Sequence, residues 1–274
     1  MSELLTSPLL RRALLEVVVV GAIGGVVGVH IVWRRLSFAT MALTHVTLPG
    51  VVIASLLGLN LVVGSAAFGL LVVGVIVLLG RQRSLDDSTA IGVLLGGGFA
   101  LGVLLISVQD GFTKDLSSFL VGSLVTVSTS DVWATFGVGL VIAALLTALH
   151  KELVAAAFDR DGAEAQGYPV VLLDALVLVA IQSALVVTVP AAGTILSVAL
   201  LVGPAATARL WTDRVGTAMA SAAAIGAGCG VVGLWASQEW DLAAGGAVAV
   251  TCGVVFFASL VATRVRPTGA VAVG

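Results

Sequence analysis

Long stretches without Asp, Glu, Lys or Arg divide this sequence, and their length constrains the fold more than any other feature. A helix needs roughly 20 apolar residues to cross about 30 Å of hydrocarbon. Two stretches, 36–80 and 175–208, leave room for two crossings each, and the others are 17–33, 88–109, 132–149, 215–238 and 242–263. These lengths predict membrane spans at 13–33, 41–57, 60–79, 90–108, 132–149, 170–189, 193–209, 215–236 and 243–263.

The pattern within these stretches selects the kind of secondary structure. An open chain in lipid satisfies its own backbone hydrogen bonds as a helix, and the apolar runs do not alternate with the period of two that barrel strands require. We therefore predict an all-α, polytopic transmembrane helical bundle with eight or nine spans. The prediction treats residues 1–274 as a single membrane domain.

Composition excludes several other classes of protein. Of the 274 residues, 59% are hydrophobic and only 10% are charged, whereas an average soluble domain has about 25% charged residues. The net charge of −2 provides no field that would recruit nucleic acid. An apolar chain of this kind is expected in a cell membrane, with the lipid bilayer as its surroundings and no nucleic-acid partner.

The order of the positive charges predicts the orientation, because cytoplasmic loops carry an excess of Lys and Arg. If the segment 150–168 is cytoplasmic, three positive residues lie outside: Arg11, Arg12 and Lys114. Ten then lie inside: Arg34, Arg35, Arg81, Arg83, Lys151, Arg160, Arg209, Arg214, Arg264 and Arg266. Nine spans place the termini on opposite sides, whereas a re-entrant segment at 41–57 would leave eight.

Glycine and proline predict close packing and breaks. Small residues at helical spacing let backbones approach closely in lipid, and two spans contain such residues: Gly21, Gly24, Gly25 and Gly28 in the first, and Gly92, Gly96, Gly97, Gly98 and Gly102 in the fourth. Pro190 and Gly193 predict an outer turn within the stretch 175–208.

His45 is the polar residue inside an apolar run that deserves a functional interpretation. A helix places Met41 and His45 one turn apart on the same face, and Pro49-Gly50 predicts a break just beyond. A thioether and an imidazole can bind a soft or borderline metal, whereas a hard ion such as manganese prefers a carboxylate beside the imidazole. The pair by itself is compatible with a metal site or with core packing.

Several blocks, in the same order along the chain, resemble the membrane permease subunits of the zinc/manganese class of ABC importers. The blocks are RRLSF at 34–38 with ALTHVTLPG at 42–50, DSTAIG at 87–92, DLSSFLVGSL at 115–124, FDRDGAEAQGYPV at 158–170 and LLVGPAATAR at 200–209. The resemblance covers most of residues 10–265. It implies that the domain is a permease and that His45 and Met41 lie on the substrate pathway, with His45 as the candidate metal ligand.

The resemblance also implies a set of partners. Two copies of the chain would surround the pathway, two ATPase subunits would bind the cytoplasmic face, and an extracytoplasmic binding protein would deliver the substrate to outer segments that include 109–131. The chain has no GxxxxGK[ST] motif, so ATP is expected on the partner subunit, and no covalently bound cofactor is expected. The chain is therefore predicted to be a transport subunit rather than an enzyme.

The segment 157–168 resembles the family's cytoplasmic loop that docks on the ATPase. Its acidic residues alternate with Arg160 and Gly162, which predicts a short polar helix that projects from the membrane, although a plain solvated loop has the same composition. The residues assigned to this coupling role are Asp159, Asp161, Ala163, Glu164 and Gly167.

Position 41 departs from the family pattern. The family residue one turn before the pathway histidine is usually aspartate, and here it is Met41. Without that carboxylate, a hard dication loses its preferred oxygen ligand and its charge compensation. Three substrates remain compatible with the pair: a softer metal ion, a metal chelate, and a substrate that is not a metal.

Two other classes of membrane protein compete with this interpretation. A gradient-driven secondary transporter usually has carboxylates at the midplane, and here every Asp and Glu is expected at or near a span end, with Asp174 close to the cytoplasmic start of its span. A non-transporting membrane scaffold gives no reason for the segment 157–168.

Overall fold

The computed structural model describes residues 7–80, 87–107, 124 and 127–265. All regular secondary structure within these ranges is helical. Eleven helices follow one another along the chain: α2 (Pro8–Trp33), α3 (Ser37–Val46), α4 (Leu48–Leu56), α5 (Leu61–Leu79), α6 (Asp87–Ser107), α8 (Thr129–Ala148), α9 (His150–Phe158), α10 (Arg160–Ala165), α11 (Val170–Arg209), α12 (Val215–Glu239) and α13 (Ala244–Val265). The predicted all-α class is confirmed.

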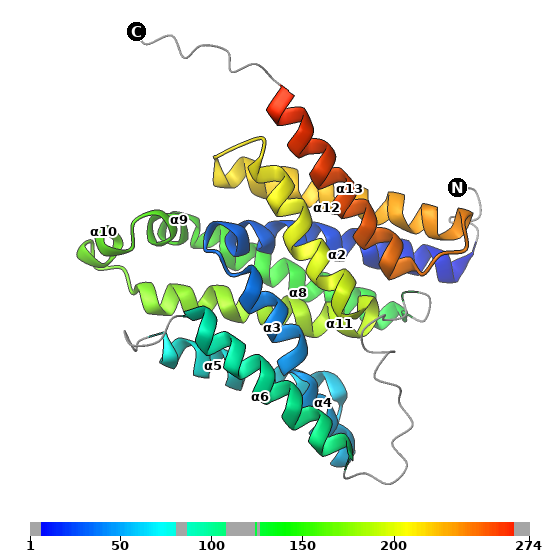
Figure 1. Cartoon of the computed structure of the whole chain (residues 1–274), viewed down its shortest axis with the longest axis horizontal. Coiled ribbons are helices and arrows are strands. Elements are labelled where there is room, and N and C mark those ends of the chain that lie inside the picture. Colours follow the sequence, from blue (N-terminus) through cyan, green and yellow to red (C-terminus); the bar gives the residue numbers. More distant parts are fainter. Residues whose placement is uncertain (1–6, 81–86, 108–123, 125–126, 266–274) are drawn as a thin grey trace.

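Eight apolar segments of the described residues are long enough to cross a membrane, and one of them folds back on itself. This segment is α11, which has 40 residues and contains Gly193 at φ 80° and ψ 167°, outside the helical region. Figure 1 shows the two arms of α11 running in different directions from this point. The turn predicted from Pro190 and Gly193 is confirmed, and counting both arms gives the nine predicted segments.

The second span is also broken, but it extends over the full length of a crossing. It comprises α3 and α4, which together run from Ser37 to Leu56, and α5 then returns beside them. Asn60 caps α5, with its side-chain oxygen accepting a hydrogen bond from the amide of Val62 at 2.8 Å. A span followed by a returning helix does not support the re-entrant alternative for 41–57.

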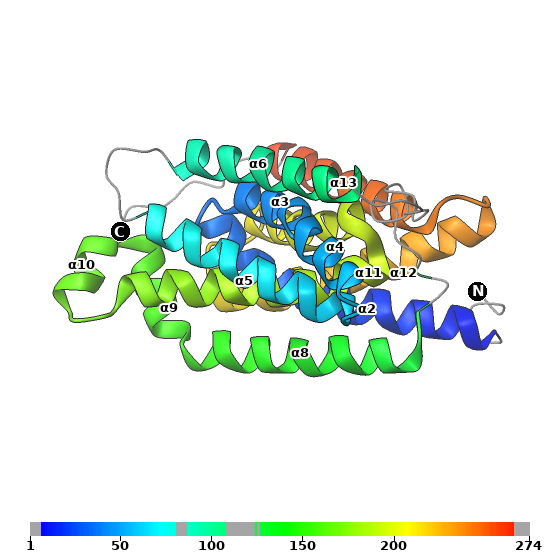
Figure 2. The same cartoon turned by 90° about the horizontal axis from the view of Figure 1, so that it is seen from below.

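Helix α2 lies at the centre of the bundle because its glycines admit two neighbouring backbones. A Cβ atom on Gly21 would lie 2.5 Å from the carbonyl carbon of Gly226 in α12, and one on Gly24 would lie 2.8 Å from the carbonyl oxygen of Leu200 in α11. Figure 2 shows α2 and α11 between α8 on one side and α6 and α13 on the other. The close packing predicted for the first span is therefore confirmed.

The glycines of α6 are also predicted to pack closely, but only some of them do. Gly98 faces the side chain of Val46 and Gly102 that of Leu48, whereas a Cβ on any of three others would meet no heavy atom within 4 Å: Gly92, Gly96 and Gly97. Only part of the predicted glycine face of α6 packs against the described residues, because α6 lies on the outside of the bundle and only 11% of its most apolar stretch is buried.

Glu16 corrects the expectation that every carboxylate lies at or near a span end. Helix α2 begins at Pro8, five residues before the predicted start of this span, so Glu16 lies well inside the helix. Its side chain is fully buried, and its Oε1 atom accepts a hydrogen bond from the hydroxyl of Thr135 in α8 at 2.8 Å. This contact joins α2 to α8 away from α9 and α10.

Candidate functional site

His45 lies in the last turn of α3, on the side of the helix that faces α6. Its ring meets the ring of Phe99 in α6 edge to face, with the centroids 6.1 Å apart. Met41 precedes it by one helical turn and is 40% exposed, while His45 is half-buried. The helix thus places the thioether and the imidazole at the predicted spacing, beside a surface that the described part of this chain leaves uncovered.

The break after His45 follows from the sequence. In an unbroken helix the carbonyl of His45 would accept from the amide of residue 49, and Pro49 has no amide hydrogen. The helix ends at Val46, and α4 begins at Leu48 after the single residue Thr47. At the break, the amide of Thr47 donates to the carbonyl of His45, and that of Val51 donates to the carbonyl of Thr47 at 3.3 Å.

The hydroxyl groups near His45 are engaged in local hydrogen bonds. Thr44 donates to the carbonyl oxygen of Met41 at 2.6 Å, and Thr47 donates to that of Thr44 at 3.2 Å. Among the described residues there is no group of three or more His, Cys, Asp and Glu side chains that could hold a metal ion. One copy of the chain therefore offers one imidazole nitrogen and one thioether sulfur at this position.

A second candidate site is the segment 157–168, for which the sequence predicts a coupling role, and it contains the short helix α10 with a defined cap at each end. Asp159 begins α10, and its Oδ1 atom accepts from the amide of Gly162 at 2.9 Å. Gly167 ends the segment at φ 86°, a left-handed conformation that favours glycine, and the amide of Tyr168 donates to the carbonyl of Ala163 at 3.1 Å. The predicted short helix is present, so the alternative of a plain loop is not supported.

The assigned residues of this segment have different surroundings. The side chain of Ala163 is 1% exposed and packs in the main core cluster, so it anchors α10 to the bundle. Asp161 and Glu164 are exposed and face away from the core. Phe158, which the sequence analysis did not single out, is 64% exposed at the junction between α9 and α10. An exposed aromatic ring beside two carboxylates forms a surface suited to binding a partner protein.

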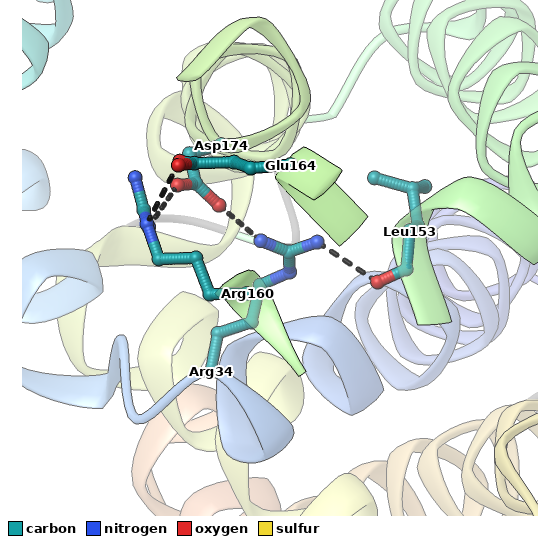
Figure 3. A network of polar contacts seen from close by, with 5 residues as sticks. All are labelled: Arg34, Leu153, Arg160, Glu164 and Asp174. Carbon is teal, nitrogen blue, oxygen red and sulfur yellow. Dashed lines mark hydrogen bonds and ion pairs between the residues drawn. The ribbon is translucent and has the colours of Figure 1, made fainter. Parts of the chain in front are cut away.

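Asp174 in α11 joins this segment to the centre of the bundle (Figure 3). Its carboxylate forms ion pairs with Arg34, at the end of α2, and with Nη1 of Arg160 in α10, the latter at 2.6 Å. Arg34 also donates from Nη2 to the carbonyl oxygen of Leu153 in α9 at 3.0 Å. The sequence placed Asp174 near the start of its span but did not predict this three-helix contact.

Burial makes the ion pair with Arg34 unusual. The side chain of Arg34 is 7% exposed and that of Asp174 is 29% exposed. Burial lowers the pKa of the Arg34 guanidinium, and the Asp174 carboxylate opposes this shift. A cavity of about 580 Å³ adjoins the pair and extends between α5, α6, α9 and α11, with Ile76, Ile91 and Leu178 among its lining residues.

The positive residues near α9 and α10 lie at one end of the bundle. The guanidinium of Arg209 lies over the ring of Trp33, 4.7 Å from its centroid, next to Arg34. Arg11 and Arg12 lie in the opposite part of α2, toward its first residue (Figure 1). This grouping agrees with the orientation from the charge count, although four of the counted residues fall outside the described ranges: Arg81, Arg83, Lys114 and Arg266. The block at 115–124 is likewise outside them, apart from Leu124.

A polytopic bundle with a broken, imidazole-bearing span and a capped helical segment at one end has the features of a membrane transport permease. The model of the ABC 3 transport family matches residues 6–263, and the chain belongs to this family. Its helices and its relatives make it a multi-pass protein of the plasma membrane.

Individual relatives match over nearly their whole length. The manganese import system permease protein ScaB of Streptococcus gordonii is 34% identical over 250 residues, which cover 91% of this chain and 90% of ScaB. The manganese transport system membrane protein MntC of Listeria monocytogenes is 34% identical over 248 residues, covering 90% and 88%. The solved structure of PsaBC from Streptococcus pneumoniae in complex with Fab matches with a TM-score of 0.84 and 33% identity, covering 94% of this chain and 93% of that one.

Proposed function

We propose that this protein is the permease subunit of an ATP-driven importer that carries a divalent transition metal across the plasma membrane. The match to the ABC 3 transport family over residues 6–263 carries this proposal, because it covers the described helices from α2 to all but the last two residues of α13. The relatives are named as manganese import and manganese transport permeases. The whole chain 1–274 acts as one permease domain.

The energy for transport comes from a partner. The chain has no phosphate-binding GxxxxGK[ST] motif, so ATP binds to a separate ATPase subunit. The coupling segment 157–168 docks on that subunit through Phe158, Asp161 and Glu164, while Asp159, Ala163 and Gly167 hold the segment in shape. An extracytoplasmic binding protein delivers the substrate at the opposite end of the bundle.

The substrate pathway lies between two copies of the chain, beside α3. Support comes from the 40% exposure of Met41 and from the uncovered glycines of α6, which leave apolar surface near His45 unpartnered by the residues that the structure describes. A second copy would supply a second His45 and a second Met41. Two imidazoles and two thioethers could hold a metal ion that one copy cannot.

The identity of the metal depends on position 41. The relatives' names favour manganese, but manganese is a hard ion and prefers oxygen ligands, which neither Met41 nor His45 supplies. Met41 therefore favours a second candidate, a softer metal ion such as zinc or iron, or a metal held in a chelate.

The elemental content of cells without this gene tests the proposal. Cells grown under metal limitation would be compared with wild type by mass spectrometry for manganese, iron, zinc, copper, cobalt and nickel. Loss of one element supports metal import and identifies the ion. An unchanged profile for all of them contradicts metal-ion import by this permease.

A further inference from the structure

Three helices meet at the carboxylate of Asp174, and one of them, α2, is distant in sequence from the other two. Arg34 reaches it from the end of α2 and Arg160 from the first turn of α10, and Asp174 itself lies near the start of α11. Arg34 also binds the carbonyl oxygen of Leu153 in α9. Figure 3 shows that both guanidinium groups point toward the same carboxylate. A displacement of α10 can therefore act on both α2 and α11 through the carboxylate of Asp174.

The end of α2 leads directly into the helix that carries the pathway residues. Two residues, Arg35 and Leu36, follow Arg34 before α3 begins at Ser37, and Arg35 has the unusual φ of 58°. The amide of Leu36 donates back to the carbonyl of Ile31 at 2.8 Å, which closes a tight turn. Because this turn is short and hydrogen-bonded, a rotation of Arg34 is expected to move α3 and with it Met41 and His45.

A second contact also joins α11 to the α2–α3 turn. Arg209, at the far end of α11, stacks on Trp33, the residue before Arg34. Both ends of α11 therefore hold the α2–α3 turn, one through Asp174 and the other through Arg209. The two arms of α11 meet at Gly193, and each arm has one of these contacts. A shift of either arm therefore displaces the α2–α3 turn.

Burial makes Asp174 necessary to this arrangement. The Arg34 side chain is 7% exposed, and its Nε atom has no hydrogen-bond partner among the described residues. A buried guanidinium is stable as a cation only with a close counter-charge, which Asp174 provides. Arg160 is exposed and can change its contacts at lower cost, and the cavity beside the pair gives it room.

We infer that Asp174 is a positioning residue that transmits movement of the coupling segment to the α2–α3 turn and so to the helix carrying Met41 and His45. This inference rests on the proposed function, since it assumes that an ATPase subunit moves the coupling segment. Asp174 touches no substrate. Its role is to keep α10, α11 and the end of α2 moving together.

The test measures the accessibility of position 41 in α3 and does not measure substrate transport. A Met41→Cys background, in the full chain purified with its ATPase subunit, is labelled with a water-soluble maleimide with and without ATP plus vanadate. The native thiols of Cys229 and Cys252 are each 3% exposed and provide little background labelling. Nucleotide trapping is expected to change the labelling rate at position 41. Asp174→Asn is expected to abolish this change while ATPase binding and basal ATP hydrolysis remain, and Asp174→Glu is expected to restore it.

Two further variants make the test specific. Arg160→Gln breaks the α10 arm but leaves the buried pair between Arg34 and Asp174 intact, so it should fold normally and lose the nucleotide-dependent change. Asp213→Asn removes the same charge from an exposed position in the loop between α11 and α12 and should keep the change.

Each outcome has a defined meaning. If Arg160→Gln or a folded Asp174→Asn still shows the nucleotide-dependent change, the inference is overturned. Loss of ATPase binding in Asp174→Asn together with an unaffected Arg160→Gln also overturns it, because Asp174 would then have only a structural role. If the Met41→Cys background binds no ATPase subunit at all, the proposed function fails, which is a separate result.

Discussion

The rings of His45 and Phe99 meet edge to face with their centroids 6.1 Å apart, and this contact links the broken second span to α6. Phe99 lies in the outer helix α6, one residue after Gly98, whose position faces Val46 of α3. The small residue lets the two helices approach closely, so the aromatic ring can hold the imidazole in one orientation. His45 is therefore fixed beside a surface that the described residues leave uncovered.

Replacing His45 removes the strongest metal ligand of the proposed pathway. We expect His45→Ala to lower metal uptake at least about tenfold, because even the outer-shell partners of a metal ligand contribute that much. Uptake into proteoliposomes that contain the permease and its ATPase would be measured. His150→Ala, at the start of α9 and outside the spans, is the matched control and should retain uptake. Full uptake by His45→Ala would show that His45 does not bind the metal on the pathway.

Introducing a carboxylate at position 41 should change which metal is preferred. Met41 is 40% exposed, so the smaller aspartate side chain has room there, and it adds the oxygen ligand that a hard ion requires. Met41→Asp is expected to raise manganese uptake relative to zinc on the order of tenfold, equivalent to about 1.4 kcal/mol. Competition between the two ions in proteoliposomes measures the ratio. An unchanged ratio would show that position 41 does not face the pathway.

Phe158 should contribute to ATPase binding. Burying a phenylalanine side chain contributes about 1.5–3 kcal/mol, so Phe158→Ala is expected to weaken the complex about tenfold or more. Affinity between the detergent-solubilised permease and its ATPase measures the effect. Trp240→Ala is the control, since Trp240 is an equally exposed aromatic residue (64%) at the end of α12 that lies away from α10. Equal affinities for Phe158→Ala and wild type would show that the ring is not part of the interface.

Gly25 should be intolerant of even a methyl group. A Cβ there would overlap the carbonyl group of Ala222 in α12, so Gly25→Ala forces two backbones apart, and such overpacking costs about 1–3 kcal/mol. Gly74→Ala in α5 meets no atom within 4 Å and should be neutral or slightly stabilising. Thermal unfolding in detergent compares the two variants. If they have the same melting temperature, the close approach of α2 and α12 does not stabilise the bundle.

Much of the fold could be predicted from the sequence because the membrane imposes simple rules. The length of the charge-free runs indicated the spans, Pro49 indicated the break after His45, and Pro190 with Gly193 indicated the turn inside α11. Each of these depends on local backbone chemistry, which neighbouring residues determine.

The contacts between distant residues could not be predicted in the same way. Arg34 and Asp174 are 140 positions apart, and Glu16 and Thr135 are 119 apart, so no local pattern indicates that they meet. The open glycines of α6 were also missed, because spacing shows which residues share a face but not what covers it. The exposure of Phe158 depends in the same way on how α9 and α10 lie against the bundle.

Metal uptake by the reconstituted importer tests the central claim most directly. Proteoliposomes containing this permease, its ATPase subunit and its binding protein would be given manganese, zinc and iron in parallel, with and without ATP. We predict ATP-dependent accumulation of at least one of these ions by the wild-type protein and its loss in His45→Ala. Accumulation of none of them by a complex that hydrolyses ATP would contradict the claim that this permease imports a divalent transition metal.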